Sequence, residues 1–249
     1  MSTPQAYIVD AIRTPVGKRN GSLAKTHPAD MGAHVIRALV ERTGLDPAVV
    51  DDVVFGCVDA IGPQAGNIAR TAWLAAGMPL EVPGTTVDRQ CGSSQQAIHF
   101  AAQGVMSGTQ DAVVVGGVQN MSAIPISQAM IAGQEFGFTT PTAESVGWRE
   151  RFGDAEVSQF VGADQMARTW DISREDMEAW ALQSHQRAKA AIAAGRFDDE
   201  TVALGDCVVD ECPRETSLEK MAGLAPLAEG SRLTAAVCLL YTSPSPRDS

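Results

Sequence analysis

The residue with the clearest chemical potential in this sequence is Cys91, which lies between a short predicted strand and a predicted helix. A thiol at a helix N-terminus feels the positive end of the helix dipole and the nearby backbone N–H groups, and both favour the thiolate. The thiolate is the nucleophilic form of cysteine. The position of Cys91 therefore predicts a nucleophile that forms covalent intermediates.

The residues after Cys91 are small, because Gly92, Ser93 and Ser94 follow it directly. Small side chains in a first helical turn let a substrate approach the sulfur and leave the first N–H groups available for an oxyanion. The competing interpretation is a small buried residue, since free cysteines are among the most buried side chains in proteins. The run of small residues favours the nucleophile.

Cysteine usage also bears on compartment and metal chemistry. An odd number of cysteines without metal-ligand spacing, in a chain far larger than disulfide-stapled miniproteins, favours a reducing compartment and no metal site. We interpret Cys57, Cys207 and Cys212 as structural. The five cysteines are Cys57, Cys91, Cys207, Cys212 and Cys238.

Alternating strand and helix patterns must position Cys91. Gly44 stops the first helical pattern, and a Val-rich run at 112–118 is typical of a strand buried on both faces. The alternation predicts a layered α/β fold. The expected strands are 6–12, 53–58, 84–87 and 112–118, and the expected helices are 29–43, 67–76 and 91–106.

The periodicity changes after residue 118. A loop rich in Gly, Pro and Thr leads to predicted helices at 158–170 and 174–194, and Ser173 with Asp176 forms a capping box for the second helix. We therefore predict an inserted domain at 119–203. It separates an α/β core at 1–118 from the continuation of that core at 204–237.

Composition limits the classes of partner. The 249 residues are 45% hydrophobic and 20% charged, with a net charge of −11, as expected for a globular protein. No run of Lys or Arg is long enough to follow a phosphate backbone, which argues against nucleic acid. Neither a secretory signal nor an apolar run of membrane-spanning length is visible. We predict a cytoplasmic protein that does not enter the membrane.

Several motifs, in order, resemble those of thiolases. The segment at 88–97, Asp-Arg-Gln-Cys-Gly-Ser-Ser-Gln-Gln-Ala, and the segment at 111–122 resemble the nucleophile helix and the following strand of this family. Residues 13–17, Arg-Thr-Pro-Val-Gly, resemble its opening motif. Residues 173–197 resemble its loop-domain helix, with the Gly-Arg-Phe ending. The resemblance covers residues 1 to about 237.

Two segments point to one branch of the family. Residues 62–71 and the Asp-Arg-Gln before Cys91 resemble actinobacterial thiolases of steroid and fatty-acid degradation. Ketoacyl synthases and hydroxymethylglutaryl-CoA synthases also use a cysteine here, but they surround it with different residues.

The resemblance implies a layered α-β-α-β-α fold with an inserted loop domain, of which this chain holds the N-terminal half. It also implies acyl transfer between a 3-ketoacyl-CoA and CoA, through an acyl group on Cys91. CoA is then a substrate, and no resident cofactor is implied. The parent enzyme is expected to be a homodimer or homotetramer. An alternative from another class is a non-catalytic CoA-binding or scaffold homologue.

The family's other catalytic groups belong to C-terminal motifs. They are a histidine before Pro-Gly, a cysteine in Cys-x-Gly-Gly-Gly and an asparagine in Asn-Glu-Ala-Phe, and none of these motifs occurs in the sequence. Its four histidines, among them His185, fit loops or helix surfaces. We therefore expect the C-terminal half to be missing and the chain by itself to be inactive. The segment 238–249 resembles translated foreign sequence.

Two positions bear on CoA itself. Arg214 stands where the family has a nucleotide-binding arginine, although the neighbouring spacing differs by one residue, and a solvated surface charge explains this arginine equally well. Ala236 and Val237 stand where many thiolases have Gly-Asn, before an Ala-Ser whose serine contacts the pantetheine. Cys238 and Leu239 follow here instead, which places that contact in doubt.

Overall fold

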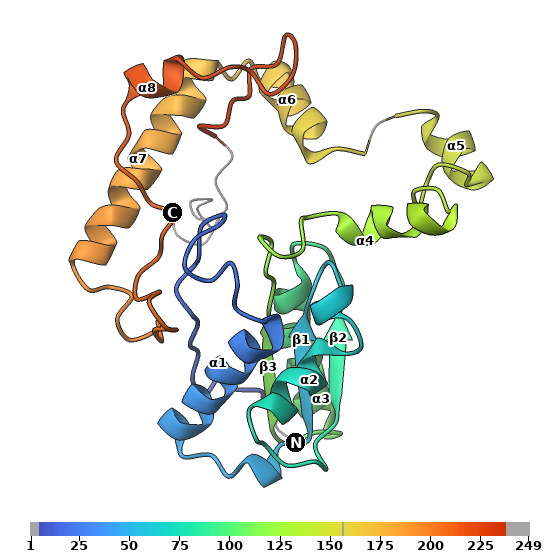
Figure 1. Cartoon of the computed structure of the whole chain (residues 1–249), viewed down its shortest axis with the longest axis vertical. Coiled ribbons are helices and arrows are strands. Elements are labelled where there is room, and N and C mark those ends of the chain that lie inside the picture. The colour runs from blue at the N-terminus through green and yellow to red at the C-terminus, as the bar shows by residue number, and fades with distance from the viewer. Residues whose placement is uncertain (1–4, 156, 238–249) are drawn as a thin grey trace. The chain divides into compact units, whose positions relative to one another are not determined.

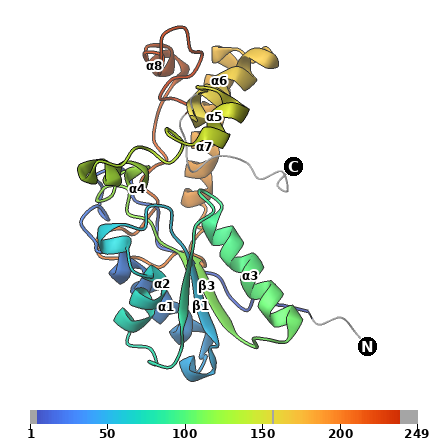
Figure 2. The same ribbon diagram turned by 90° about the vertical axis from the view of Figure 1, so that its right-hand side faces the viewer.

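The computed structural model describes residues 5–155 and 157–237, and its elements are labelled in Figures 1 and 2. The chain divides into two compact units. The sheet unit comprises the residues up to 144 together with 199–210, and the helical unit comprises 145–198 with the residues after 210. Each unit is described by itself below.

The sheet unit is built on three parallel strands, β1 (Asp52–Gly56), β2 (Gly84–Val87) and β3 (Val113–Gly117). Their order is β2-β1-β3, so the first strand lies in the centre. Strands of a parallel sheet are buried on both faces, which explains the Val-rich runs. These strands confirm the α/β class and the strands predicted from residues 53, 84 and 112 onward.

Helices α1 (Pro28–Thr43) and α2 (Ile68–Ala75) cover one face of this sheet, as Figure 2 shows. Gly44 ends α1 in the left-handed conformation, as predicted. Between the helices and the sheet lies the larger core cluster. Its buried side chains include Ile36, Val53, Phe55, Ile68, Trp73 and Val114.

Helix α3 (Ser93–Ser107) covers the opposite face and packs Ala97 against Val54 and Val87. Its first turn lies directly against the carboxyl ends of β1 and β3. A methyl group added at Gly56 would lie 2.5 Å from the carbonyl carbon of Ser93, and one added at Gly117 would lie 2.8 Å from the carbonyl oxygen of Gly56. Only glycine leaves room for this approach.

Short helical segments fill the connections of the sheet unit. They are η1 (Pro47–Val49), η2 (Gly62–Gln64), α4 (Gln128–Ile131) and η3 (Ala132–Phe136).

The predicted strand at 6–12 is wrong. Tyr7, Ile8 and Val9 are 79%, 76% and 86% exposed and lie in no strand. A strand is stable only when a neighbour satisfies its N–H and C=O groups. Within the described residues this run has no such neighbour, and the first pairing after it is a single bridge between Arg13 and Thr201.

The helical unit contains α5 (Val146–Phe152), α6 (Gln159–Thr169), α7 (Arg174–Ala193) and α8 (Leu218–Ala222). The predicted capping box is confirmed, because the Ser173 hydroxyl accepts from the Asp176 N–H and the Asp176 carboxylate accepts from the Ser173 N–H. A small core of Ala181, Met221 and Ala236 joins α7, α8 and the segment before residue 238.

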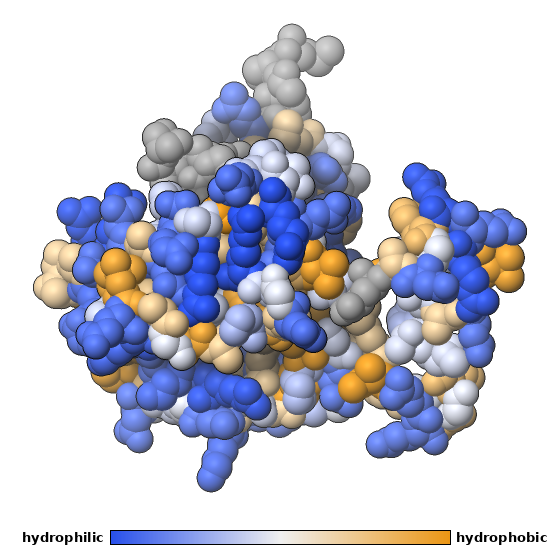
Figure 3. Space-filling view, turned by 90° about the horizontal axis from the view of Figure 1, so that it is seen from above, coloured by the Kyte–Doolittle hydropathy of each residue, from blue (hydrophilic) through white to orange (hydrophobic). Residues whose placement is uncertain are grey.

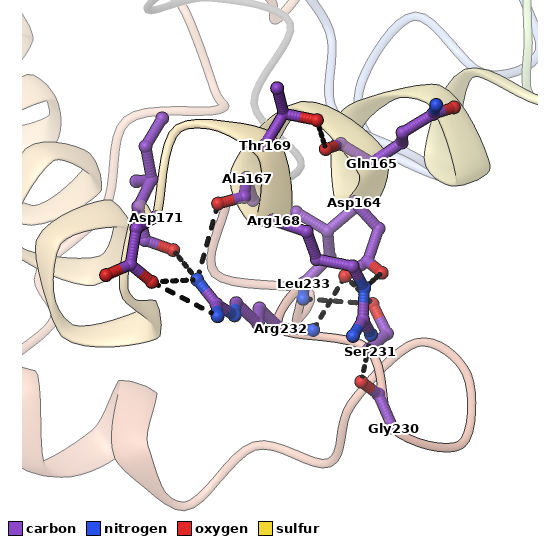
Figure 4. Close-up of polar contacts among 11 residues, drawn as sticks. Asp164, Gln165, Ala167, Arg168, Thr169, Asp171, Gly230, Ser231, Arg232 and Leu233 are labelled. Carbon is purple, nitrogen blue, oxygen red and sulfur yellow. Dashed lines mark hydrogen bonds and ion pairs between the residues drawn. The ribbon is translucent and has the colours of Figure 1, made fainter.

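A charged cluster fastens residues 230–233 to α6 in the helical unit (Figure 4). The Asp164 carboxylate accepts from Arg168 Nε at 2.7 Å, from the Arg232 N–H at 2.8 Å and from the Ser231 hydroxyl at 3.0 Å. The Arg168 hydrogen bond is the largest of the effects that lower the pKa of Asp164. Arg232 in turn donates to the Ile172 carbonyl at 2.8 Å.

The unit boundaries differ from those predicted at 118/119 and 203/204. The chain divides instead at 144/145, 198/199 and 210/211. The loop after β3 stays with the sheet because the buried Asn120 amide donates to the carbonyls of Leu23, Ala24 and Thr26. The segment after 210 packs against α7 instead of returning to the sheet. Residues 238–249, including Cys238 and Leu239, lie outside the described residues.

The surface is mixed in character. On the face drawn in Figure 3, hydrophobic residues lie scattered among hydrophilic ones. None of the helices in the described ranges is both long and apolar enough to cross a bilayer.

The five-layer arrangement implied by the resemblance needs two sheets. Residues 5–155 and 157–237 contain a single sheet, the one formed by β2, β1 and β3.

We predict that Gly117→Ala destabilises the chain by about 2 kcal/mol, because the added methyl overpacks the contact between α3 and the strand ends. Gly162→Ala is the control, since a methyl added at this exposed position in α6 meets no atom within 4 Å. Urea denaturation of both variants measures the effect. Equal midpoints for Gly117→Ala and the unchanged chain would show that α3 does not need this close approach.

Candidate functional site

Cys91 lies in the turn between β2 and α3, and its side chain is exposed. The helix begins at Ser93 with Gly92 as its N-cap, two residues later than predicted. Cys91 therefore stands just before the helix start. The interpretation of Cys91 as a small buried residue is wrong, because the sulfur is open to solvent.

A cavity of about 270 Å³ opens beside Cys91. It is formed by the carboxyl ends of β1 and β3 and by the first turn of α3. In parallel α/β sheets, ligands bind at the carboxyl ends of the strands. The lining residues are Gly56, Cys57, Val58, Gln90, Cys91, Ser93, Ser94, Gly117, Val118 and Gln119.

The first turn of α3 carries backbone N–H groups without partners in the described part of the chain, and one of the residues that bear them, Ser94, lines the cavity. The backbone N–H groups of Ser94 and Gln95 donate to no acceptor among the residues that the structure describes. Such N–H groups at a helix start can stabilise an oxyanion that forms next to a nucleophile. The arrangement therefore fits a thiolate that attacks a carbonyl group.

Cys57 lines the same cavity but is suited to a different role. Burial raises the pKa of its thiol to about 11, and the nearby charges of Asp59 and Asp88 add to the effect. Its Sγ donates to Gln119 Oε1 at 3.7 Å. Cys57 therefore stays protonated at neutral pH, in agreement with the structural role predicted for it.

A buried polar network behind the cavity is a feature that the sequence did not reveal. Asp59 is 1% exposed, and its carboxylate accepts from the Ala129 N–H at 2.9 Å and the Ser127 N–H at 3.2 Å. Gln119 Nε2 donates to the same carboxylate at 3.4 Å. The loop after β3 is thereby held as one wall of the cavity. The sequence feature that could have revealed this network is a polar residue soon after the end of each strand.

Arg214 belongs to the helical unit, whereas Cys91 belongs to the sheet unit. Arg214 is exposed and lies on a second cavity of about 210 Å³ between α7 and the segment 214–216. Lys189 and Glu215 form an ion pair in its wall. The complete lining is Leu182, His185, Gln186, Lys189, Arg214, Glu215 and Thr216.

His185 was expected on a surface, and this prediction is wrong because the residue is 2% exposed. Its Nδ1 accepts from the backbone N–H of Arg214 at 3.4 Å, while its buried Nε2 has no hydrogen-bond partner among the residues that the structure describes. Burial, and then the charge of Arg214, lower the pKa of His185. The imidazole is therefore neutral at pH 7. Only the packing of segment 211–216 against α7 reveals this burial.

Proteins bind metal ions through groupings of side chains. Across residues 5–155 and 157–237, no group of three or more His, Cys, Asp or Glu side chains is arranged to hold a metal ion.

Comparison with known proteins agrees with this geometry. The family model described as thiolase, N-terminal domain, matches residues 6–238. A steroid 3-ketoacyl-CoA thiolase of Mycobacterium tuberculosis is 63% identical over 237 residues, which are 94% of this chain and 58% of the relative. A beta-ketoadipyl-CoA thiolase of Acinetobacter baylyi is 41% identical over 238 residues, covering 88% of this chain and 59% of the relative.

A 3-ketoacyl-CoA thiolase of Pseudoalteromonas translucida is 38% identical over 234 residues, covering 88% of this chain and 57% of the relative. The chain thus spans less than two thirds of the length of these relatives. The predicted resemblance to degradative thiolases is confirmed by the relative from Mycobacterium tuberculosis.

We predict that iodoacetamide modifies Cys91 in the folded chain and leaves Cys57 unmodified up to about pH 8, because the Cys57 thiol, with a pKa of about 11, stays protonated there. Peptide mass mapping after a short exposure measures both sites. The same reaction in urea is the control, since unfolding removes the burial of Cys57. Rapid labelling of Cys57 in the folded chain would contradict the prediction.

Proposed function

Because this chain belongs to the thiolase family, we propose that the whole protein transfers acyl groups between a 3-ketoacyl-CoA and CoA. The observation that carries the proposal is an exposed Cys91 thiol beside free helix N–H groups, at a cavity formed by the carboxyl ends of a parallel sheet. These features supply a nucleophile, an oxyanion site and room for an acyl group.

In the proposed reaction, the Cys91 thiolate attacks the keto carbon of the substrate. The bond between this carbon and the neighbouring carbon of the thioester breaks, and acetyl-CoA leaves after its carbanion takes up a proton. The acyl group remains on the sulfur until the thiol of CoA accepts it. The N–H groups of Ser94 and Gln95 are suited to hold the oxyanion that forms in each step.

The groups that move protons in this reaction have no counterpart near Cys91 among the described residues. Neither His27 nor His99 lines the cavity, and Cys57 is held protonated. This supports the proposal that the remainder of the whole protein supplies the base. We therefore expect the 249-residue chain alone to show a reactive Cys91 without turnover.

For the substrate, we propose a steroid-derived or fatty 3-ketoacyl-CoA. The support is the 63% identity to a relative that is named a steroid 3-ketoacyl-CoA thiolase. CoA acts as a substrate, and the proposal includes no resident cofactor. We further propose a homodimer or homotetramer in the cytoplasm, in keeping with the free thiols of Cys57 and Cys91.

For the CoA phosphates, we propose the cavity beside Arg214. Arg214 and Lys189 bring two positive charges to its wall, and the buried His185 Nε2 offers a hydrogen-bonding group without a partner. A phosphate would take the place of the exposed Glu215 carboxylate as the partner of Lys189. Charge-assisted hydrogen bonds from Arg and Lys are the usual means of holding phosphate.

We predict that Cys91→Ala abolishes thiolysis of acetoacetyl-CoA by the whole protein while CoA still binds, because only the nucleophile is removed. Cys212→Ala is the control, since Cys212 lies outside the Cys91 cavity. Thioester absorbance follows the reaction, and calorimetry follows CoA binding. Turnover that survives in Cys91→Ala would refute the assignment. A wild-type protein that binds CoA without turnover would favour the non-catalytic homologue.

We also predict that Arg214→Ala weakens CoA binding by about tenfold or more, the range expected when one charged hydrogen bond to a phosphate is lost. Arg187→Ala is a matched control, because Arg187 lies on α7 outside the cavity lining. Calorimetry with CoA and with dephospho-CoA measures the effect. Equal affinities for the two variants would identify Arg214 as a solvated surface charge.

A further inference from the structure

The residue before Cys91 has an unusual backbone conformation. Gln90 has a φ of +48°, in the left-handed region that side chains with a Cβ rarely occupy. Such a conformation persists only where the surrounding contacts determine it. Its position next to the proposed nucleophile makes the contacts that hold it relevant to the reaction.

Ser93 makes two of these contacts. Its hydroxyl donates to the Gln90 carbonyl at 2.5 Å and accepts from the Arg89 N–H at 2.9 Å. The Ser93 side chain is buried, with the residue 4% exposed. One hydroxyl therefore joins the peptide group between residues 88 and 89 to the peptide group that follows the strained Gln90.

The backbone closes the turn around Cys91 as well. The Gly92 N–H donates to the Arg89 carbonyl and the Ser93 N–H donates to the Gln90 carbonyl, both at 3.1 Å. These bonds span Cys91 without using its side chain. The Asp88 carboxylate adds a further bond by accepting from the Gln90 N–H at 2.8 Å. The thiol thus projects from a turn in which the N–H groups of the residues on both sides of Cys91 are engaged.

The space behind Ser93 is closed. Because β1 ends in Gly56, whose added methyl would strike Ser93, the serine side chain lies directly against the strand end. The hydroxyl is thereby fixed on one side by the sheet and on the other by the turn. A movement of the turn would require Ser93 to leave both contacts.

We propose that Ser93 is a positioning residue for Cys91. Its hydroxyl holds Gln90 in the left-handed conformation, and this conformation sets the Cys91 sulfur at the mouth of the cavity beside the unpaired N–H groups of α3. The inference rests on the proposed function only in taking Cys91 as the nucleophile.

The test measures the alkylation of Cys91 by iodoacetamide in the 249-residue chain, which does not require turnover. At about pH 7 we expect Ser93→Ala to lower the rate about fivefold, as loss of a buried hydrogen bond implies. At about pH 10, where ordinary cysteine thiols are ionised, we expect the rates to converge, because access is unchanged. Ser107→Ala is the control, since its hydroxyl bonds only within the far end of α3 and its neighbouring turn.

A double-mutant cycle with Gln90→Gly separates positioning from a general loss of structure. Glycine adopts a positive φ without steric cost, so the turn needs less support in the Gln90→Gly background. We therefore expect Ser93→Ala to lower the rate less than twofold there. The same fivefold loss in both backgrounds, or a loss that persists at about pH 10, would overturn the proposal. Failure of the thiolase assignment would instead appear as absent turnover in the whole protein, with these labelling results unchanged.

Discussion

The close approach of helix α3 to the ends of two parallel strands is the constraint on which the site depends. Gly56 and Gly117 stand where any side chain would strike the first turn of the helix. Because these two glycines have no Cβ, the turn between β2 and α3 can lie at the edge of the sheet where β1 and β3 end. The carboxyl ends of β1 and β3 and the turn that follows β2 therefore meet around one cavity, which Cys91 lines.

Two cysteines line this cavity, and they differ in their exposure to solvent. Cys91 is exposed on the turn before α3, whereas Cys57 lies at a buried strand end, where desolvation and nearby carboxylates raise its pKa to about 11. The polar network through Asp59 holds the opposite wall. Burial and nearby negative charge thus distinguish the protonated Cys57 thiol from the exposed Cys91 thiol.

Local patterns predicted the elements whose signals are carried by neighbouring residues. Gly44 ends α1, Ser173 caps α7, and Cys91 precedes α3, because capping and strand patterns act over a few residues. Features set by distant segments could not be predicted in this way. The run at 6–12 has strand character but finds no neighbouring strand within residues 5–155 and 157–237. The burial of His185 depends on residues some thirty positions later.

The central claim is that the acyl group transferred by the whole protein passes through Cys91 in the cavity at the strand ends. Peptide mass mapping after rapid quenching with a 3-ketoacyl-CoA, in the absence of free CoA, tests this claim most directly. We expect one acyl group on the peptide that carries Cys91, and we expect added CoA to remove it. An acyl group on another residue, or none under conditions where the protein turns over, would contradict the claim.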